Sequence, residues 1–228
     1  MTREIFIVAV LVSSSLCRAR ASEITGKVLI DRSISRKTVV VPAVYQLRGM
    51  AVAPTAADSA GSTEFDRVAV WLEPESAAGH AAPVNVSMRQ RNRRFEPALL
   101  VIPVGSTVEF PNMDPIFHNI FSLSSAQPFD LGYYPAGQSR RVRFDSAGII
   151  QVYCHVHSSM YGAIVVTSSP WFGKPDRNGN FSWTGVPAGT YRLGVWQRTV
   201  GLKLKPITVP ASGVLRVELV LPGGDEEK

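Results

Sequence analysis

Short apolar runs recur along the chain, and Gly, Pro, Asn or Asp residues separate them. Runs rich in β-branched residues and bounded by such turn-forming residues are typical of β-strands. The strands predicted in this way cover residues 24–30, 37–45, 67–72, 84–88, 98–101, 106–110, 119–123, 139–144, 148–154, 163–167, 180–183, 190–196, 207–209 and 214–221. No stretch keeps apolar residues at the i, i+3, i+4, i+7 spacing over the length of a helix. The pattern therefore predicts an all-β protein built as sandwiches.

The segments between the predicted strands indicate how the chain is organised. Residues 50–63 and 76–83 are small, polar or rich in Ala, Gly and Pro, and they predict loops. Sixteen Pro and 18 Gly fit a fold with many short turns. A chain of 228 residues has room for one large domain or two small ones.

Composition and charge narrow the class of protein. A hydrophobic share of 45% and a charged share of 18% argue against wholesale disorder and against a coiled coil. The formal net charge of +6 allows an acidic partner but does not demand nucleic acid. The basic run of Arg89, Arg91, Arg93 and Arg94 has only Phe95 as a nearby aromatic residue. A nucleic-acid patch is the alternative, but we expect an exposed turn or a docking rim and no nucleic-acid partner.

The first residues have the pattern of an export signal. Residues 5–12 are all apolar, a run much shorter than the ~20 residues that a membrane-spanning helix needs. Arg3 precedes this run, and Ala19 and Ala21 supply a small-x-small cleavage site. We therefore predict a signal peptide over residues 1–21, an exported protein, periplasmic or secreted, and no transmembrane segment. A buried N-terminal strand is the alternative.

The few cysteines point to a metal. Two cysteines exclude a disulfide-rich scaffold, and loss of the signal peptide would remove Cys17 and leave Cys154 as an unpaired thiol. Cys154, His157 and Met160 follow one another at a Cys-x2-His-x2-Met spacing, and His118 lies at the end of another predicted strand. Cysteine, two histidines and a weak axial methionine form the ligand set of a blue-copper site, because Cu(I) favours soft sulfur and Cu(II) favours nitrogen.

Each of these residues also has another interpretation. Cys154 with a histidine could form a nucleophilic dyad, or the cluster could hold structural zinc, which would want closed Cys/His ligation. Met160 could simply fill the core, and Met113 could replace it as the axial ligand. His155 is next to Cys154 and should point to the opposite face of the strand, so we expect it not to be a ligand. The alternative is that it supports a ligand indirectly or binds a metal itself. We expect His80 to be solvated.

The middle of the chain, residues 84–167, resembles a cupredoxin. It is similar to plastocyanin and, in the length of the Cys-x2-His-x2-Met loop, to amicyanin. The matching motifs are Phe95-Glu96-Pro97, residues 104–110, His118-Asn119, Gly148 before Tyr153-Cys154, and residues 162–166. The resemblance implies a Greek-key β-sandwich and one type 1 copper that cycles between Cu(I) and Cu(II). It implies that copper is bound by His118, Cys154, His157 and Met160, that Asn119 braces the ligand loops, and that the edge of His157 is the electron portal.

The two flanks of this segment resemble a single further module. Residues 176–181 and 185–193 resemble carboxypeptidase-regulatory-like modules of transthyretin-type fold, with Asn178-Gly179 as a hairpin turn. The Asp and Asn residues of this turn could suggest a calcium loop. The position of its glycine does not fit such a loop and the distal glutamate is missing, so we do not expect calcium here. Such a module needs earlier strands, and Gly26-Lys27-Val28 and residues 68–72 resemble them.

These resemblances together predict the domain organisation. We expect a second, immunoglobulin- or transthyretin-like sandwich made of residues 22–83 and 169–222, interrupted by a cupredoxin domain at residues 84–168. An acidic tail would follow at residues 223–228. Two domains in plain succession are the alternative.

The predicted function is single-electron transfer by an exported copper protein, similar to exported cupredoxins of the methylamine-utilization type. We expect no enzyme activity, because a single blue-copper site moves one electron and offers no substrate position. The expected partner is a redox protein, with an acidic surface as one option. It would dock on an apolar rim of Pro115, Ile116, Phe117 and Tyr161 near His157. The alternatives are copper storage or delivery, and an interaction module with structural copper.

Overall fold

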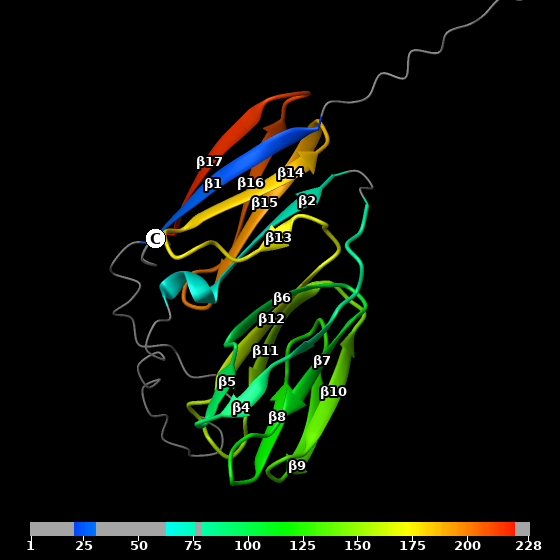
Figure 1. Cartoon of the computed structure of the whole chain (residues 1–228), viewed down its shortest axis with the longest axis vertical. Helices are drawn as coiled ribbons and strands as arrows, with labels where there is room; N and C mark the ends of the chain where they lie inside the picture. The colour runs from blue at the N-terminus through cyan, green and yellow to red at the C-terminus, as the bar shows by residue number, and fades with distance from the viewer. Residues whose placement is uncertain (1–20, 31–62, 76–78, 222–228) are drawn as a thin grey trace, which may run out of the picture.

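The computed structural model describes residues 21–30, 63–75 and 79–221. Apart from one turn of 3-10 helix, η2 (Glu64–Arg67), these residues form β-strands and loops, which confirms the all-β prediction (Figure 1). The strands are β1 (Ser22–Ile30), β2 (Val68–Pro74), β3 (Asn85–Ser87), β4 (Arg89–Arg91), β5 (Arg94–Glu96), β6 (Leu99–Pro103), β7 (Ser106–Pro111), β8 (His118–Ser122), β9 (Phe129–Tyr134), β10 (Ser139–Phe144), β11 (Gly148–Tyr153), β12 (Tyr161–Thr167), β13 (Phe172–Gly173), β14 (Asn180–Val186), β15 (Gly189–Gln197), β16 (Gly201–Val209) and β17 (Val214–Leu221). The predicted strand at 37–45, the signal peptide up to residue 20, and the acidic tail lie outside the described residues.

Strands from both ends of the described chain pair in two sheets, which we call the flanking sandwich. One sheet has the order β14-β1-β17, with β1 antiparallel to β14 and parallel to β17. The other has the order β13-β2-β15-β16, with all neighbours antiparallel. β1 and β2 therefore lie beside strands that come more than a hundred residues later. The boundaries predicted at residues 83 and 169 stay a prediction.

Strands β3 to β12 form the central sandwich. One sheet has the order β6-β12-β11-β8-β9 and the other the order β10-β7-β3, while β4 and β5 pair as a separate hairpin. Two pairs are parallel, β3 with β7 and β6 with β12, and the remaining sheet pairs are antiparallel. Between the two sheets lies an apolar core that includes Phe110, Phe144 and Ile164.

The four main sheets lie in successive layers, so some strands are apolar on both faces (Figure 1). Successive side chains of a strand point to opposite faces of the sheet. In β2, alternate residues enter the core of the flanking sandwich while Ala69 and Trp71 face the central sandwich. In β12, Ile164 enters the core of the central sandwich while Ala163 and Val165 face β2. The two sandwiches therefore meet through a third, smaller apolar cluster.

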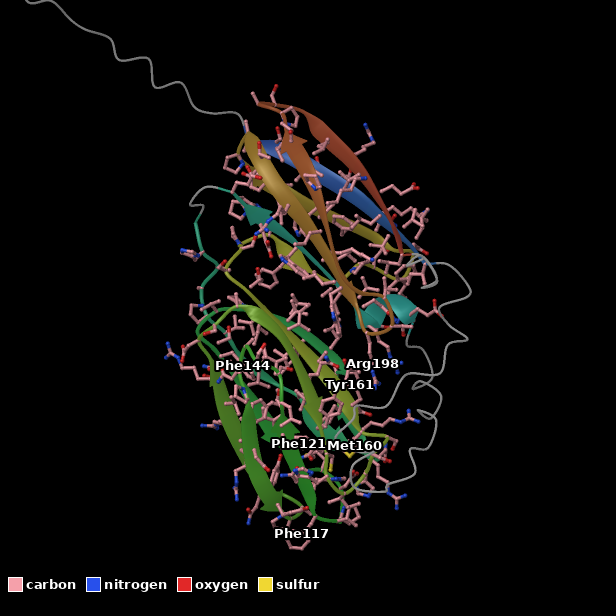
Figure 2. All side chains as sticks on the ribbon, turned by 180° about the vertical axis from the view of Figure 1, so that it is seen from behind. Phe117, Phe121, Phe144, Met160, Tyr161 and Arg198 are labelled. Carbon is pink, nitrogen blue, oxygen red and sulfur yellow. The ribbon has the colours of Figure 1, made fainter. Side chains whose placement is uncertain are left out.

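The turn between β15 and β16 adds a polar contact to this junction. The guanidinium carbon of Arg198 lies 3.4 Å from the ring centroid of Tyr161, the first residue of β12 (Figure 2). The Tyr161 ring also makes an edge contact with Tyr153, at 5.5 Å between centroids. Tyr161 packs against the junction cluster and is only partly exposed. The expectation that Tyr161 belongs to an exposed apolar rim is therefore wrong, because the flanking sandwich covers its ring.

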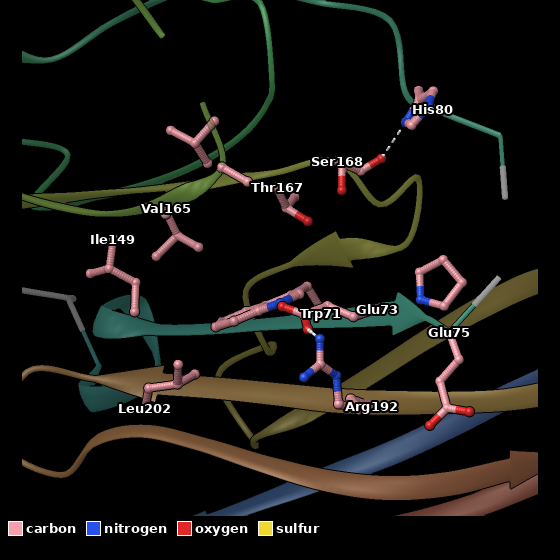
Figure 3. A pocket seen from close by; sticks show the side chains of 14 residues that line it. Trp71, Glu73, Glu75, His80, Ile149, Val165, Thr167, Ser168, Arg192 and Leu202 are labelled. Carbon is pink, nitrogen blue, oxygen red and sulfur yellow. Dashed lines mark hydrogen bonds and ion pairs between the residues drawn. The ribbon is translucent and has the colours of Figure 1, made fainter. Parts of the chain in front are cut away.

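A cleft of about 610 Å³ opens beside the junction (Figure 3). Its apolar lining includes Ile149, Val165 and Leu202. Its polar end carries an ion pair between Arg192 and Glu73, at 2.9 Å between Nη2 and Oε2. The exposed side chain of His80, as expected at the surface, lies there with Nδ1 3.0 Å from the Ser168 carbonyl.

Four strands, β4, β5, β9 and the two-residue β13, have no counterpart among the strands predicted from the apolar pattern. β4 and β5 form a hairpin in the run that we expected to be an exposed turn, and β9 falls in a segment without a strand prediction. β4 reads Arg-Gln-Arg and only its central residue is buried, so it carries no apolar alternation. Among the described residues, no helix is long and apolar enough to cross a membrane.

Candidate metal centre

Strand ends bring the predicted ligands to one end of the central sandwich. His118 is the first residue of β8. Cys154 directly follows β11, and Met160 directly precedes β12. His157 lies in the loop between these two strands. The cross-strand pair Tyr153 and Tyr161 closes this loop, so seven residues carry three of the four predicted ligands.

The donor atoms of three of these residues form a compact group. One donor atom each from His118, Cys154 and His157 lies within 4.8 Å of the others. Nδ1 of His118 is 3.6 Å from Sγ of Cys154, and the two imidazole ring centroids are 4.9 Å apart. His118 and Cys154 are fully buried, whereas His157 is partly exposed. Donor atoms this close together could hold a single metal ion.

The donor set suits copper. Nδ1 of His157 is buried and has no hydrogen-bond partner among the described residues, which leaves a nitrogen available for a metal. Met160 is fully buried in the same apolar cluster as Cys154, and its amide donates to the His157 carbonyl at 3.0 Å, which closes the ligand loop. A thiolate and two imidazoles with a nearby thioether fit copper and do not fit the oxygen sites of calcium or magnesium.

Hydrogen bonds favour the thiolate form of Cys154. Burial opposes ionisation of this thiol, but the contact with His118 and hydrogen bonds from the backbone amides of Asn119, His157 and Val156 favour the thiolate. These interactions outweigh burial, so the pKa of Cys154 lies below its usual value. Because the thiolate is the metal-binding form, the chain itself prepares this ligand.

Asp114 fixes the orientation of His118. Its Oδ2 lies 2.8 Å from Nε2 of His118, and the pair is buried. An ionised carboxylate can only accept hydrogen bonds, so Nε2 of His118 carries the proton of this bond. Nδ1, the other ring nitrogen, faces the sulfur of Cys154. Burial lowers the pKa of His118, but its bonds to Cys154 and Asp114 outweigh burial and raise the pKa above the usual value.

The Asp114 carboxylate is itself held by a neighbouring turn. It accepts hydrogen bonds from the backbone amides of Asn92 at 2.6 Å and Arg93 at 2.8 Å. Burial raises the pKa of Asp114, but the bonds from Arg93, His118 and Asn92 outweigh burial and lower it. Asp114 therefore connects the β4–β5 turn to the donor group.

Asn119 and His155 have roles different from those of the donors. The amide of Asn119 contributes a hydrogen bond to the Cys154 sulfur, while its side chain donates to Asp130 at 2.6 Å. His155 stacks on Phe121 at 3.9 Å between ring centroids, and its Nε2 lies 3.4 Å from Asp130. His155 is thus not part of the donor group, although it lies in the ligand loop after β11 and not in a strand as the sequence argument assumed.

The pKa of His157 is shifted in the direction opposite to that of His118. Burial, the charge of His118 and the charge of Arg93 all lower the pKa of His157, and Asp114 offsets them only partly. A neutral imidazole is the form that binds a metal. Arg93 is therefore close enough to influence this side chain electrostatically.

Sequence reasoning missed two acidic residues at this site, Asp114 and Asp130. Asp114 stands four residues before His118 in the same short segment, and a carboxylate so near a predicted ligand histidine is a signal that could have identified it. Asp130 lies on β9, which had no strand prediction, so nothing in the sequence related it to Asn119 or His155.

Comparison with known proteins gives structural likenesses only. No protein-family model matches the chain, and no curated protein matches it. Among solved structures, a purple cupredoxin from Nitrosopumilus maritimus is 26% identical over 36% of this chain and 99% of that one, with a TM-score of 0.34. A reduced Cu(I) amicyanin variant is 21% identical over 43% of this chain and 98% of that one, with a TM-score of 0.35.

A larger copper protein also resembles part of the chain. The Cu-containing nitrite reductase from Thermus scotoductus SA-01 is 28% identical over 42% of this chain, with a TM-score of 0.36. The match covers only 25% of that enzyme. Each of these likenesses covers less than half of this chain, and the TM-scores are too low to assign fold or function. The inference about function therefore rests on the residues of the chain itself.

Proposed function

We propose that this chain binds one copper ion through His118, Cys154, His157 and Met160 and carries single electrons. The observation that supports the proposal most is the donor group, in which a thiol and two imidazoles from two separate segments lie within 4.8 Å of one another. When bound, copper in such a site supplies a reversible one-electron couple. The resemblance of residues 84–167 to cupredoxins points in the same direction.

The rigidity of the site favours an electron carrier over a copper store. His118 and Cys154 have no exposure, and each is fixed by hydrogen bonds to Asp114 or to backbone amides. Ligands fixed before the metal arrives move little when the electron does, which keeps the barrier to transfer low. A store or delivery protein needs a ligand that opens easily to release Cu(I). His157 is the one partly exposed donor and would be the route for electrons.

Cu(II) titration with optical detection tests the ligand assignment. The copper-loaded protein should show an intense visible charge-transfer band, because the Cu(II)–thiolate bond is covalent. Cys154→Ser should lose this band even if copper still binds. His155→Ala is the matched control and should keep it, because His155 stacks on Phe121 outside the donor group. A band that survives in Cys154→Ser contradicts the assignment.

Voltammetry with a Cu(I) chelator in solution tests the choice between carrier and store. We expect a reversible one-electron wave and retention of copper in both oxidation states, because buried hydrogen-bonded residues hold two of the ligands. Rapid loss of copper to the chelator after reduction would instead assign the chain to storage or delivery. It would leave the ligand assignment unchanged.

A further inference from the structure

The hairpin of β4 and β5, which we call the arginine hairpin, has a charged turn that copper binding does not require. Its two turn residues, Asn92 and Arg93, have positive φ angles of 53° and 56°. A two-residue hairpin turn of this kind is easily adopted by Asn and Gly, whereas a long L-residue such as arginine adopts it at a cost. A strained residue that is held in place by its surroundings is often functional. The unfavourable backbone conformation of Arg93 therefore indicates that its side chain has a function.

Hydrogen bonds hold the arginine hairpin against the candidate metal centre. Asp114 accepts from the amides of both turn residues and also contacts His118. The amide of Met113 donates to the carbonyl of Gln90 in β4 at 2.8 Å. The ring of His118 lies 4.9 Å, between centroids, from the ring of His157, the partly exposed donor. The hairpin is therefore placed beside the proposed electron route, and its backbone has little freedom to move away.

Exposed apolar side chains lie next to the same ligands. Phe117, directly before His118, is 59% exposed, and Val156, directly before His157, is 46% exposed. Met113, which is bonded to the hairpin, is 58% exposed. Figure 2 shows Phe117 at the end of the central sandwich farthest from the flanking sandwich. Apolar side chains gathered on an exposed surface are typical of protein interaction sites.

Within the described part of the chain, the arginine side chains at the tip of the hairpin form none of the ion pairs that arginines elsewhere form. Residues 89–96 contain four arginines and one acidic residue, Glu96, which is the cross-strand partner of Arg89. On β10, by contrast, Arg141 pairs with Glu109 and Arg143 with Asp145. No carboxylate of the described residues forms such an ion pair with the side chain of Arg91 or Arg93.

We propose that Arg91 and Arg93, together with Met113, Phe117 and Val156, form a docking surface for an acidic redox protein. The inference rests on the proposed function, and it adds the chemistry of the partner. Carboxylates of the partner would pair with the two arginines, while the apolar residues exclude water beside His157. Positive charge raises the rate of encounter with an acidic partner, and apolar contact sets the orientation. A negatively charged membrane surface is the competing occupant.

Voltammetry of the copper-loaded full chain on charged monolayers tests the proposal. A carboxylate-terminated monolayer is the probe for an acidic surface, and an amine-terminated monolayer is its counterpart. At about 10 mM salt, where the Debye length is about 30 Å, the unmodified protein should exchange electrons at least about tenfold faster on the carboxylate surface. The double variant Arg91→Gln, Arg93→Gln should lose most of this preference, with rates compared at equal overpotential.

A matched double variant separates local charge from net charge. Arg177→Gln with Arg216→Gln removes the same charge from exposed positions on the flanking sandwich, and it should keep the preference for the carboxylate surface. The visible band of each loaded variant reports whether the copper site is intact. Raising the salt to about 300 mM should abolish the preference in every variant, because exposed charges are then screened.

The possible failures are distinguishable. If the unmodified protein gives no reversible wave on either surface, the proposed function fails. If the wave is reversible but the rates on the two surfaces are equal, or the two double variants behave alike, the docking surface is overturned. Binding to vesicles of phosphatidylserine and phosphatidylcholine, lost in Arg91→Gln, Arg93→Gln, would overturn the protein partner and assign the surface to a membrane.

Discussion

The two sandwiches use similar strands to build interiors of different chemistry. The core of the flanking sandwich consists of apolar side chains from β1, β2 and β14 to β17. The core of the central sandwich includes Cys154 and Met160 among its apolar residues, with His118 buried beside them. In the described part of the chain, the one group of clustered metal donors lies in the central sandwich. A β-sandwich as such therefore does not make a metal site.

The difference comes from the loop that one hairpin in each sandwich carries. In the flanking sandwich the last pair of the β15–β16 hairpin is Gln197 with Gly201, and three residues join them. The side-chain oxygen of Gln197 accepts hydrogen bonds from the backbone amides of Thr199 and Val200. The side chain of this short turn is therefore used to bind the turn's own backbone. In the central sandwich the seven residues between Tyr153 and Tyr161 leave room for three donors. Loop length and composition, set on similar strands, decide the chemistry.

The largest expected effect comes from matched core truncations in the two sandwiches. Leu193→Ala and Ile164→Ala each remove a fully buried side chain, one from each core. Truncations of this kind cost about 2–5 kcal/mol in free energy of unfolding. If the sandwiches unfold separately, Leu193→Ala should destabilise the flanking sandwich and leave the copper band at its original urea midpoint. Ile164→Ala should lower the midpoint at which the band is lost.

The chain supplies a separate probe for each sandwich. All four tryptophans lie in or beside strands of the flanking sandwich, at positions 71, 171, 183 and 196. Tryptophan fluorescence therefore reports the flanking sandwich, while the visible band reports the central sandwich. Unfolding transitions that coincide for both probes in both variants would mean that the chain unfolds as one unit. The predicted division at residues 83 and 169 would then have no energetic meaning.

The sequence predicted the donors of the site better than their surroundings. Cys154, His157 and Met160 were recognisable because their side chains are chemically rare and lie within seven residues. Their nearness to His118 followed from a resemblance, and the donor distances between His118, Cys154 and His157 agree with it. Asp114 was not recognisable, because an aspartate in a loop is common and its bond to His118 depends on the fold.

The strands were predictable where burial imposes an apolar pattern. β2 and β12 are buried on both faces and stand out as continuous apolar runs. β4 and β9 each have only one buried residue, so tertiary pairing rather than an apolar pattern makes them strands. Tyr161 was misassigned for a related reason. Its exposure depends on Arg198, which comes from a part of the chain that the local pattern cannot relate to it.

The smallest expected effect concerns the contact of Arg198, from the flanking sandwich, with Tyr161 at the base of the ligand loop. Tyr153 and Tyr161 close that loop, and both hydroxyl groups donate to Oε1 of Gln151, at 2.9 Å and 3.5 Å. Arg198 covers the Tyr161 ring, and burial raises the pKa of Tyr161 in spite of this positive charge. The flanking sandwich thus places a cation over the residue that follows Met160.

Removing this cation should lower the reduction potential slightly. The oxidised site carries one more positive charge than the reduced site, so a nearby cation destabilises the oxidised form. A charge–charge interaction of about 0.5 kcal/mol between Arg198 and the extra charge of the oxidised site corresponds to about 20 mV for one electron, which is the size of shift expected in Arg198→Ala. Arg192→Ala, on the strand β15 that leads into this turn, is the control and should leave the potential unchanged, because Arg192 pairs with Glu73 away from the loop. Arg198→Lys separates the two contributions: an unchanged potential assigns the effect to charge, and a potential equal to that of Arg198→Ala assigns it to the stacked guanidinium. If Arg198→Ala has the potential of the unmodified protein, the flanking sandwich does not tune the site.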